Sequence, residues 1–464
     1  MSKSNRRDFM KLALGGIAAT GISGAIPFQL NAMNAMVLPE PGRRGKTMMR
    51  QACAPIPEVR IGVIGLGMRG MEGVSRLLQV EGCRITAVCD LLTERVRSAQ
   101  QKVVNAGQPE PAGYASGEED WMNLCKRDDI DLVYICTPWK WHVPNAIEAM
   151  KNGKHAAVEV PAALTIEDCW QLVDTSEETR RHCMMLENCC YDFFEMATLV
   201  MARKGMFGEI MHAEAAYIHD LRWLKFDETN GYYPMWRRDY SRYHTGNPYP
   251  THGLGPVAQI MGINQGDRME YLTRMSTRQT GMSLYAQEKF GHQSSYARQE
   301  YHLGDMNTTL VRTILGKTIM IQHDTTSPRP YSRIHLISGT KGFAQKWPDQ
   351  KLAFEPDAHH WVEDGRMKKL LKENEHPLAS QIGEKARKVG GHGGMDYIMD
   401  YRLIYCLRNG LPLDQTVYDA AAWSSLVELS EISVKTGSRP VAIPDFTRGH
   451  WEHTPPLGIE TVTF

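Results

Sequence analysis

The sequence predicts an α/β protein in which an N-terminal, doubly wound parallel sheet is followed by an α+β domain with a large, open, mostly antiparallel sheet. Apolar, β-branched runs alternate with helical patterns over residues 59–187, which is typical of parallel βαβ units. A glycine motif directly follows the first of these runs. Residues 272–281 and 308–323 alternate apolar and polar side chains, as strands with one solvated face do. We therefore expect one domain over residues 59–187 and a second over residues 188–464.

An export signal is predicted at the N-terminus. Residues 5–11, Asn-Arg-Arg-Asp-Phe-Met-Lys, resemble a twin-arginine motif, and a weakly apolar run over residues 12–26 follows. That run is too short to span a bilayer, so we assign residues 1–31 to a removable signal peptide. The alternative is an ordinary N-terminal helix. Residues 32–58, rich in Pro, Arg and Gly, are predicted to be a linker, and the mature protein is expected in the periplasm or outside the cell.

A dinucleotide-binding turn is predicted between the first strand and the first helix. The apolar strand over residues 59–64 runs into a Gly-x-Gly-x-x-Gly motif formed by Gly65, Gly67 and Gly70. In this context the first glycine permits the tight turn, the second admits a pyrophosphate and the third allows close packing. The pyrophosphate then lies at the helix N-terminus, where free N–H groups favour an anion. A chance glycine-rich turn is the alternative.

The cofactor preference follows from the second strand. Residues 84–89 are predicted to form it, and it ends in Asp90, about 20 residues beyond the glycines. A carboxylate at this place accepts hydrogen bonds from the adenosine ribose hydroxyls and repels a 2′-phosphate. The expected cofactor is therefore NAD rather than NADP.

Four further residues are expected at the ligand-binding edge of this sheet. Ligands of doubly wound sheets lie beyond the carboxyl ends of the strands. Trp139, His142, Glu159 and Asn188 each follow a predicted strand, so they should lie at that edge. The predicted strands are 131–136, 155–158 and 183–186, and the predicted helices between them are 143–151 and 166–179.

Composition excludes some partners and favours a carbohydrate. The 464-residue chain has a formal net charge of +0, which leaves no basic excess for nucleic acid. Tyr and Trp are concentrated between Tyr217 and Tyr249, with His and Arg among them. Aromatic faces with polar tips suit a sugar, although a loop pinned by aromatic packing is the alternative. We expect a small-molecule or glycan substrate, no nucleic acid and no stable membrane insertion, and we leave a homo-oligomer open.

The cysteine and histidine patterns predict no disulfide framework and no metal ion. Several of the ten cysteines lie in apolar, strand-like runs, as buried thiols do, and there is no pair of CxxC motifs. His392 and Asp396 lie four residues apart after a glycine-rich turn. Two ligands are too few for a metal ion, so this pair either completes a pocket or staples a helix start.

The rest of the second domain is predicted from local pattern. Residues 356–390 are charged, and we expect them to form a solvated insertion with His376 at its surface. Residues 396–409 and 416–435 have the pattern of amphipathic helices.

From Val59 onward the chain resembles the Gfo/Idh/MocA family of sugar oxidoreductases, in which a Rossmann domain precedes an α/β domain whose open sheet carries the sugar site. Dehydrogenases of that family have Glu-Lys-Pro where this chain has Glu159-Val160-Pro161, and their lysine assists proton transfer from the oxidised hydroxyl. Val160 cannot transfer a proton, which argues against a simple sugar dehydrogenase. The resemblance rests on the glycine motif, Asp90, Thr137-Pro138, His142, Glu159 to Pro161 and Glu187-Asn188.

A closer resemblance is to glycoside hydrolase family 109, whose members are NAD-dependent α-N-acetylgalactosaminidases. The motifs that carry it are the signal, Trp139-Lys140-Trp141-His142, Glu159-Val160-Pro161, Met235-Trp236-Arg237, Tyr249-Pro250-Thr251-His252-Gly253 and Gly391-His392-Gly393-Gly394-Met395-Asp396. Cofactor contacts are thereby implied for Gly65, Gly67, Met68, Arg69, Gly70, Asp90, Trp139, Lys140, Trp141, His142, Glu159, Val160 and Asn188. Sugar contacts are implied for Glu187, Tyr217, Arg237, Tyr249, Pro250, Thr251, His252 and Tyr331.

The resemblance implies that NAD serves as a built-in redox cofactor. Most glycosidases place two carboxylates around the scissile bond, a scheme in which NAD has no role. In an oxidation–elimination route, NAD oxidises the sugar at C3, and the resulting ketone acidifies the C2 hydrogen so that the aglycone can leave from C1. Water then adds at C1 and C3 is reduced again, so the net reaction is hydrolysis.

His252 and Tyr249 are the catalytic residues we expect, because histidine is best suited to move protons near neutral pH. Which of the two is the acid and which the base stays open, and the alternative for His252 is a helix cap. Arg237 can hold sugar hydroxyls or form a surface ion pair. Two other functions compete: a sugar dehydrogenase that releases NADH, and a non-catalytic periplasmic sugar-binding protein.

Overall fold

The computed structural model describes residues 35–229 and 231–461. The predicted signal peptide, residues 1–31, lies outside the described residues. Within the described part of the chain, no helix is both long and apolar enough to cross a membrane.

Residues 35–58, predicted to be a linker, form an irregular segment that packs on the protein. They contain no helix. Met48 is buried, and its N–H donates a hydrogen bond to the Tyr418 hydroxyl at 2.8 Å. The Arg180 guanidinium donates to the carbonyl of Lys46 at 2.6 Å. Backbone groups of this segment therefore have partners far along the chain.

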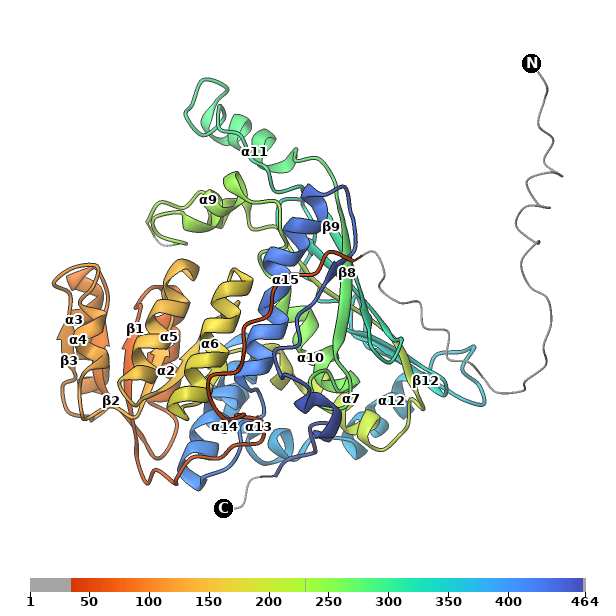
Figure 1. Ribbon diagram of the computed structural model, residues 1–464, viewed down its shortest axis with the longest axis horizontal. Helices are drawn as coiled ribbons and strands as arrows, with labels where there is room; N and C mark the ends of the chain where they lie inside the picture. Colours follow the sequence, from red (N-terminus) through yellow and green to blue (C-terminus); the bar gives the residue numbers. More distant parts are fainter. Residues whose placement is uncertain (1–34, 230, 462–464) are drawn as a thin grey trace. The chain divides into compact units, whose positions relative to one another are not determined.

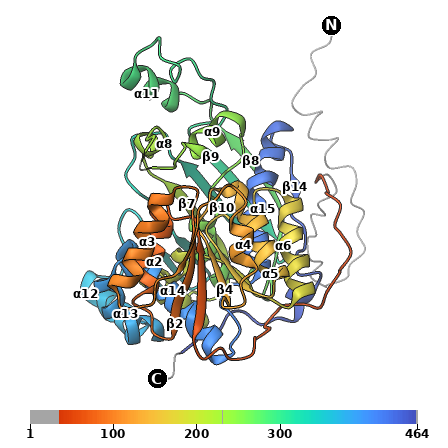
Figure 2. The same cartoon turned by 90° about the vertical axis from the view of Figure 1, so that its left-hand side faces the viewer.

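The first sheet is entirely parallel, with strand order β3-β2-β1-β4-β5-β6. Figure 2 shows α2 and α3 on one side of it and α5 and α6 on the other, which is the doubly wound arrangement that the sequence predicts. The strands are β1 (Val59–Ile64), β2 (Cys83–Cys89), β3 (Ala112–Tyr114), β4 (Leu132–Ile135), β5 (His155–Val158) and β6 (Cys183–Met185). The helices are α2 (Met68–Leu77), α3 (Thr93–Asn105), α4 (Trp121–Cys125), α5 (His142–Lys151) and α6 (Ile166–Thr179).

The strand order reverses between β1 and β4, and this reversal creates the crevice of the first domain. After β1 the chain proceeds outward to β2 and β3, then crosses back to β4 on the other side of β1. The loops that follow β1 and β4 therefore diverge above the carboxyl ends of these strands, where ligands of such sheets bind.

The second sheet has the order β13-β12-β11-β7-β10-β9-β8-β14. Only the β7–β10 pair is parallel, so the predicted large and mostly antiparallel sheet is confirmed. In β9 Val311 is buried while its neighbour Leu310 is exposed, as expected when one face is solvated. The strands are β7 (Ile210–Ile218), β8 (Met269–Ser276), β9 (Asn307–Thr313), β10 (Thr318–Asp324), β11 (Leu336–Gly339), β12 (Gly342–Gln345), β13 (Lys351–Phe354) and β14 (Val441–Ala442).

Helices cover the inner face of the second sheet and connect it to the first domain. Helix α10 packs on β7, and α15 packs on β8 as well as on α6 and β6 of the first domain (Figure 1). The α-helices of this part are α7 (Phe193–Arg203), α8 (Arg222–Lys225), α9 (Trp236–Tyr243), α10 (Thr251–Met261), α11 (Gly281–Phe290), α12 (Asp364–Glu373), α13 (Pro377–Val389), α14 (Met395–Asn409) and α15 (Val417–Lys435). The 3₁₀ turns of the described chain are η1 (Trp139–Trp141), η2 (Asn188–Tyr191), η3 (His392–Gly394) and η4 (His450–His453).

Two predictions about this half of the chain are wrong. Helices α14 and α15 were expected to be amphipathic, but α14 is buried nearly all round from Met395 to Leu407 and α15 from Val417 to Glu431, because elements of both domains cover them. His376 was expected at the surface, but it is buried and its ring caps α13 by accepting the N–H of Leu378 at 3.2 Å. A charged neighbourhood in the sequence conceals this local capping role.

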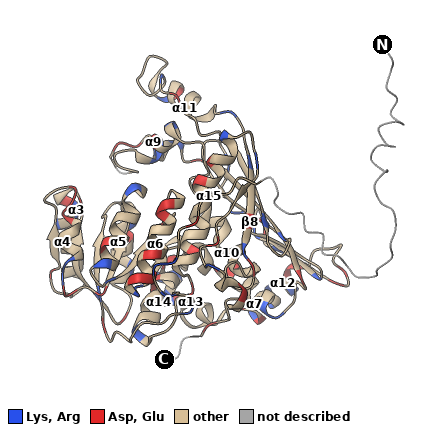
Figure 3. Ribbon diagram, in the orientation of Figure 1, with Lys and Arg blue, Asp and Glu red and all other residues tan. Residues whose placement is uncertain are grey.

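The buried apolar side chains of the two sheets form one continuous core. All ten cysteines are free thiols, and eight of them are buried, as predicted for a chain without a disulfide framework. Figure 3 shows acidic and basic residues interspersed along the chain, in keeping with its net charge of +0.

Candidate active site

The glycine turn after β1 is built to admit a dinucleotide. Gly65 has φ +87°, and a Cβ on it would lie 2.7 Å from the backbone of Cys136. A Cβ on Gly70 would lie 1.8 Å from the carbonyl oxygen of Gly65. On Gly67, by contrast, a Cβ would meet nothing closer than Arg95 Nη1 at 3.5 Å, so it would occupy the open crevice at the start of α2. The protein's own packing requires the outer two glycines, while Gly67 keeps space for a pyrophosphate.

Asp90, at the end of β2, is held by backbone groups and faces the same crevice. Its oxygens accept the N–H of Leu66 at 2.6 Å and the N–H of Leu92 at 3.0 Å, and Arg95 Nη1 lies 3.8 Å away. A carboxylate has about four acceptor positions, so these contacts leave capacity for ribose hydroxyls. Two adjoining cavities, one smaller than the other, share Gly65, Asp90 and Arg95. Together they suit the two halves of NAD.

The other predicted cofactor residues fall into two groups around these cavities. Gly70 and Asn188 are the exceptions: Gly70 is buried behind the turn, and Asn188 is connected to the cavity only through Asp396, which also binds Arg69. Met68, Arg69, Trp139, His142, Glu159 and Val160 line the smaller cavity with Gly65, Gly67 and Asp90. Lys140 and Trp141 line the larger one.

Hydrogen bonds fix the loops after β4 and β5. The Trp139 indole N–H donates to the carbonyl of Val160 at 3.0 Å. The His142 ring nitrogens lie 2.8 Å from the carbonyls of Pro161 and Thr137. Burial lowers the pKa of His142, so its ring is neutral and its single N–H donates to one of these two carbonyls.

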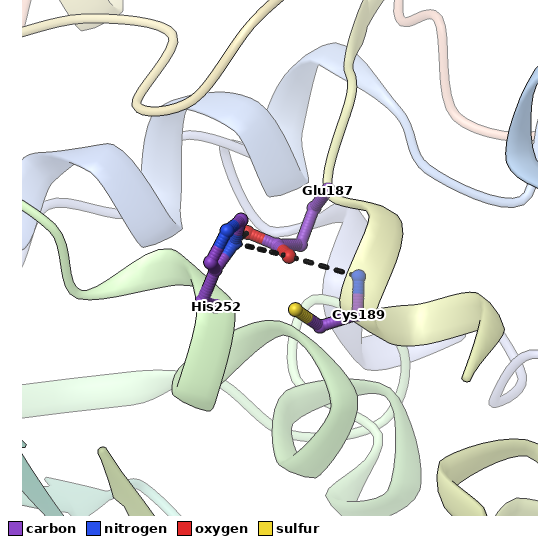
Figure 4. A group of neighbouring side chains, drawn as sticks. All are labelled: Glu187, Cys189 and His252. Atoms are coloured by element: carbon purple, nitrogen blue, oxygen red, sulfur yellow. Dashed lines mark hydrogen bonds and ion pairs between the residues drawn. The ribbon is translucent and has the colours of Figure 1, made fainter. Parts of the chain in front are cut away.

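A histidine–carboxylate pair lies where the second domain meets the carboxyl end of the first sheet. Glu187 follows β6, and His252 is the second residue of α10. His252 Nδ1 lies 2.8 Å from Glu187 Oε1 and 3.0 Å from Oε2 (Figure 4). The Glu187 side chain is fully buried, whereas that of His252 is 12% exposed. His252 therefore does more than cap a helix.

This pair fixes both the charge of Glu187 and the tautomer of His252. Burial alone would raise the pKa of Glu187, but the charge of His252 and its hydrogen bond hold that pKa below its usual range. An ionised carboxylate only accepts hydrogen bonds, so His252 Nδ1 carries a proton. Its Nε2 has no hydrogen-bond partner among the described residues and is available to a substrate.

Cys189, Glu187 and His252 are residue types that can bind a metal ion, and their possible ligand atoms lie within 4.8 Å of one another. The N–H of Cys189 donates to Glu187 Oε1 at 3.1 Å, and the Cys189 side chain is buried. Figure 4 shows that the short contact between Glu187 and His252 is a direct one. Because that hydrogen bond occupies the space between the two donors, the geometry is that of an oriented base rather than of an open coordination sphere.

Aromatic rings and one guanidinium form the neighbouring wall. Tyr249 and Tyr217 rings lie 4.7 and 5.4 Å from the His252 ring, and Tyr331 lies 6.4 Å from Tyr217. Burial raises the pKa of the Tyr249 phenol, which therefore stays protonated and able to donate. The structure thus brings these predicted sugar contacts together. Pro250 and Thr251 form the turn that starts α10 beneath them.

Arg237 lies over this wall and also lines the smaller cavity. Its guanidinium is 4.1–5.1 Å from the centres of four rings: Trp139, Tyr232, Trp236 and Tyr249. No carboxylate of the described chain pairs with it within 4 Å, so the surface ion-pair alternative is wrong. A cation held by ring faces and the Tyr232 hydroxyl at 3.0 Å keeps donors for a ligand.

Sequence reasoning missed several residues of this site. His219 lies two residues beyond Tyr217 and therefore on the same face, and its ring is 4.8 Å from Tyr217 and 5.0 Å from Tyr331. Burial, with the charges of His252, Arg237 and His392, lowers the pKa of His219 to about 4. The period of two along β7 is the signal that could have found it.

Asp396, the second residue of α14, joins the two domains beneath the crevice. Its carboxylate is fully buried and accepts hydrogen bonds from Asn188 and from Arg69 Nη1, the latter at 3.0 Å. Arg69 also pairs with Glu159 at 3.0 Å. Asp396 therefore does more than start a helix, because it connects Asn188 to Arg69, which lines the smaller cavity.

Comparison with known proteins identifies the family. Residues 59–187 match the family described as "Oxidoreductase family, NAD-binding Rossmann fold", and residues 191–453 match "Glycosyl hydrolase 109, C-terminal domain". The chain belongs to glycoside hydrolase family 109. It is thus a glycoside hydrolase, and its cofactor is NAD.

Relatives in family 109 cover nearly the whole chain. An alpha-N-acetylgalactosaminidase of Bacteroides fragilis is 55% identical over 86% of this chain and 94% of the relative. One of Shewanella oneidensis is 46% identical over 99% of both chains.

Solved structures share the fold at low identity. Levoglucosan dehydrogenase in complex with NADH aligns with a TM-score of 0.61 at 16% identity, covering 84% of this family 109 chain and 100% of the other. Myo-inositol dehydrogenase from Lactobacillus casei, in complex with NAD(H) and myo-inositol, has a TM-score of 0.56 at 16% identity, covering 84% and 99%.

Proposed function

We propose that this enzyme hydrolyses terminal α-N-acetylgalactosamine residues by oxidation at C3, elimination, water addition and re-reduction, with NAD recycled in each turnover. The names of the two relatives support the substrate. The mechanism rests on one observation: the oriented base His252 stands at the carboxyl end of the sheet that forms the cofactor crevice. When bound, NAD supplies the redox chemistry by taking the C3 hydrogen with its electron pair and returning it later.

The acidic residues of the site support this route over the two-carboxylate scheme. Glu187 is fully buried and bonded to His252, and Glu159 is bonded to Arg69 at 3.0 Å. A glycosidase of the ordinary kind needs one carboxylic acid to protonate the leaving oxygen and one carboxylate to act on C1 or on water. Neither Glu187 nor Glu159 is free to take such a role.

Each remaining residue of the wall has a part in proton transfer or orientation. His252 Nε2 can remove the C2 proton once the C3 ketone has acidified it, and can return a proton there after water has added at C1. The neutral Tyr249 phenol can hydrogen-bond the developing enolate oxygen. Arg237 offers donors to sugar hydroxyls or to the acetamide oxygen.

A sugar dehydrogenase that releases reduced NAD is the competing function, because the same first domain would serve it. Val160 sets this chain apart from those dehydrogenases, since this buried aliphatic side chain stands where they carry a lysine, although oxidation at C3 releases a hydroxyl proton in either function. The oriented base His252 favours the glycosidase, because it can remove the acidified C2 proton before the oxidised sugar leaves.

Hydrolysis of an aryl α-N-acetylgalactosaminide in heavy water tests the proposal. We expect one deuterium at C2 of the released sugar, because elimination breaks the C2–H bond and a solvent-exchanged group returns the proton. The enzyme should work with its co-purified NAD and accumulate no NADH. Product with protium alone at C2, from active enzyme, would refute elimination, and steady NADH release from free sugar would indicate the dehydrogenase.

We also propose that the folded enzyme is exported through the twin-arginine route to the periplasm or beyond. The Arg6-Arg7 motif supports this, as do ten free cysteines in a chain that must load its cofactor before export. Replacing Arg6 and Arg7 with lysines should leave the activity in the cytoplasmic fraction. Unchanged fractionation would exclude this route.

A further inference from the structure

A second histidine–carboxylate pair stands beside the first. His392 Nδ1 lies 3.0 Å from Oδ2 of the buried Asp396. Asn188 donates to the other oxygen of Asp396, and the residue before Asn188 is Glu187, the partner of His252. The two pairs therefore stand on either side of the Glu187–Asn188 dipeptide. Burial is the main cause that lowers the pKa of His219, and the charges of both histidines lower it further.

Asp396 is suited to orient the His392 ring. Burial would raise the pKa of Asp396, but the hydrogen bond from His392 and the charges of Arg69 and Arg76 hold it well below its usual range. The two arginines have further carboxylates, since Arg69 binds Glu72 and Glu159 while Arg76 binds Asp400. An ionised carboxylate only accepts hydrogen bonds, so His392 Nδ1 carries a proton towards Asp396.

The loop that carries His392 has a special backbone. All five residues of 390–394 have positive φ, and His392, at φ +46°, is the one among them with a side chain. A Cβ on Gly391 would lie 2.7 Å from Cβ of Asp396, so the glycine lets the loop close over this carboxylate.

The exposures of the two histidines separate their roles. The side chain of His252 is 12% exposed and lies against the aromatic wall, whereas that of His392 is 51% exposed. An aglycone must extend from C1 towards solvent, while C2 belongs to the enclosed ring. We infer that His392 donates the proton to the departing glycosidic oxygen and that Asp396 is its positioning residue. This inference rests on the proposed function.

The elimination step then balances. The C2 proton moves to His252, the electron pair of that C–H bond forms the C1=C2 double bond, and the C1–O bond breaks with its pair going to oxygen. The Nε2 proton of His392 moves to that oxygen, while Nδ1 keeps its proton towards Asp396. When water adds at C1, its proton passes to His392 and C2 regains a proton, which restores both histidines.

Leaving-group dependence tests this role. For His392→Gly, we expect kcat/KM for a methyl α-N-acetylgalactosaminide to fall by about 10²-fold or more, because an alkoxide cannot leave without a proton. A nitrophenyl glycoside should lose less than about tenfold, since nitrophenolate leaves unprotonated, and added imidazole should restore part of the methyl glycoside rate. An equal loss on both substrates, or no loss on the methyl glycoside, would overturn the inference.

Glycine suits the loop, so the variant should fold and keep its NAD, as measured by released nucleotide and thermal unfolding. If it does not, His392→Asn serves, because asparagine tolerates a positive φ. His360→Gly is the matched control: it removes another histidine–aspartate pair, His360 with Asp357 at 2.8 Å, on the exposed surface. It should change neither rate.

The heavy-water experiment separates this inference from the proposed function. His392→Gly acting on the nitrophenyl glycoside should still place deuterium at C2. Deuterium at C2 together with an equal loss on both glycosides refutes the role of His392 alone. Absence of deuterium in the wild-type product refutes the elimination route itself.

Discussion

Replacing Glu187 with glutamine should abolish most activity without unfolding the enzyme. Glu187 is fully buried, and its oxygens serve two donors, His252 Nδ1 at 2.8 Å and the N–H of Cys189 at 3.1 Å. Glutamine has the same shape but one acceptor oxygen and an N–H₂ group. If that group faces His252, Nδ1 must accept, and the ring proton moves to Nε2, where the base is needed.

The size of the effect follows from these contacts. A hydrogen bond to a charged group contributes about 1.5–3 kcal/mol and a neutral one about 0.5–1.5 kcal/mol, so loss of the charge alone costs about tenfold. The wrong tautomer adds to this, and we expect kcat on an aryl glycoside to fall by about 10²- to 10⁴-fold. NAD content should not change, because Glu187 does not line the cofactor cavities.

The matched control is Glu431→Gln, which removes a carboxylate that faces His244 Nδ1 at 3.1 Å in a pair that does not line the cavities. That variant should keep its rate. A folded, NAD-loaded Glu187→Gln enzyme with kcat within threefold of the wild type, or an equal loss in the control, would refute the assignment of His252 as an oriented base.

Two further predictions concern the cofactor turn and stability. Gly67→Ala should fold but lose NAD, as released nucleotide will show, whereas Gly70→Ala should not fold, because its Cβ would lie 1.8 Å from a carbonyl oxygen. Burial lowers the pKa of Lys225 to about 7, so the unfolded chain binds the extra proton between pH 7 and about 10 and wild-type stability rises across this window. If Lys225→Met has a higher free energy of unfolding than the wild type, the difference between the two proteins should therefore become smaller as pH rises. Denaturant titrations that give the same difference at every pH would contradict this.

The sequence by itself determined the features that depend on neighbouring residues. The predicted strand over residues 59–64 is β1, and the predicted helix over residues 166–179 is α6, with the same bounds. Glycine spacing and Asp90 also sufficed for the cofactor, because the turn, the helix start and the next strand end lie within one βαβ unit. Such units bury their own apolar face, so the local pattern of apolar residues predicts where their strands and helices lie.

Only the tertiary structure decided how the catalytic groups are paired. Glu187 and His252 are 65 positions apart, and Asn188 and Asp396 are 208 apart, yet each pair shares a hydrogen bond. No local period links such positions, since their contact depends on how α10 and α14 of the second domain pack against the end of the first sheet. The same cause explains α15: its polar residues predicted a solvated face, but elements of both domains bury them. Burial by distant elements, which sequence pattern does not record, decided which charges are paired and which histidine nitrogens face a substrate.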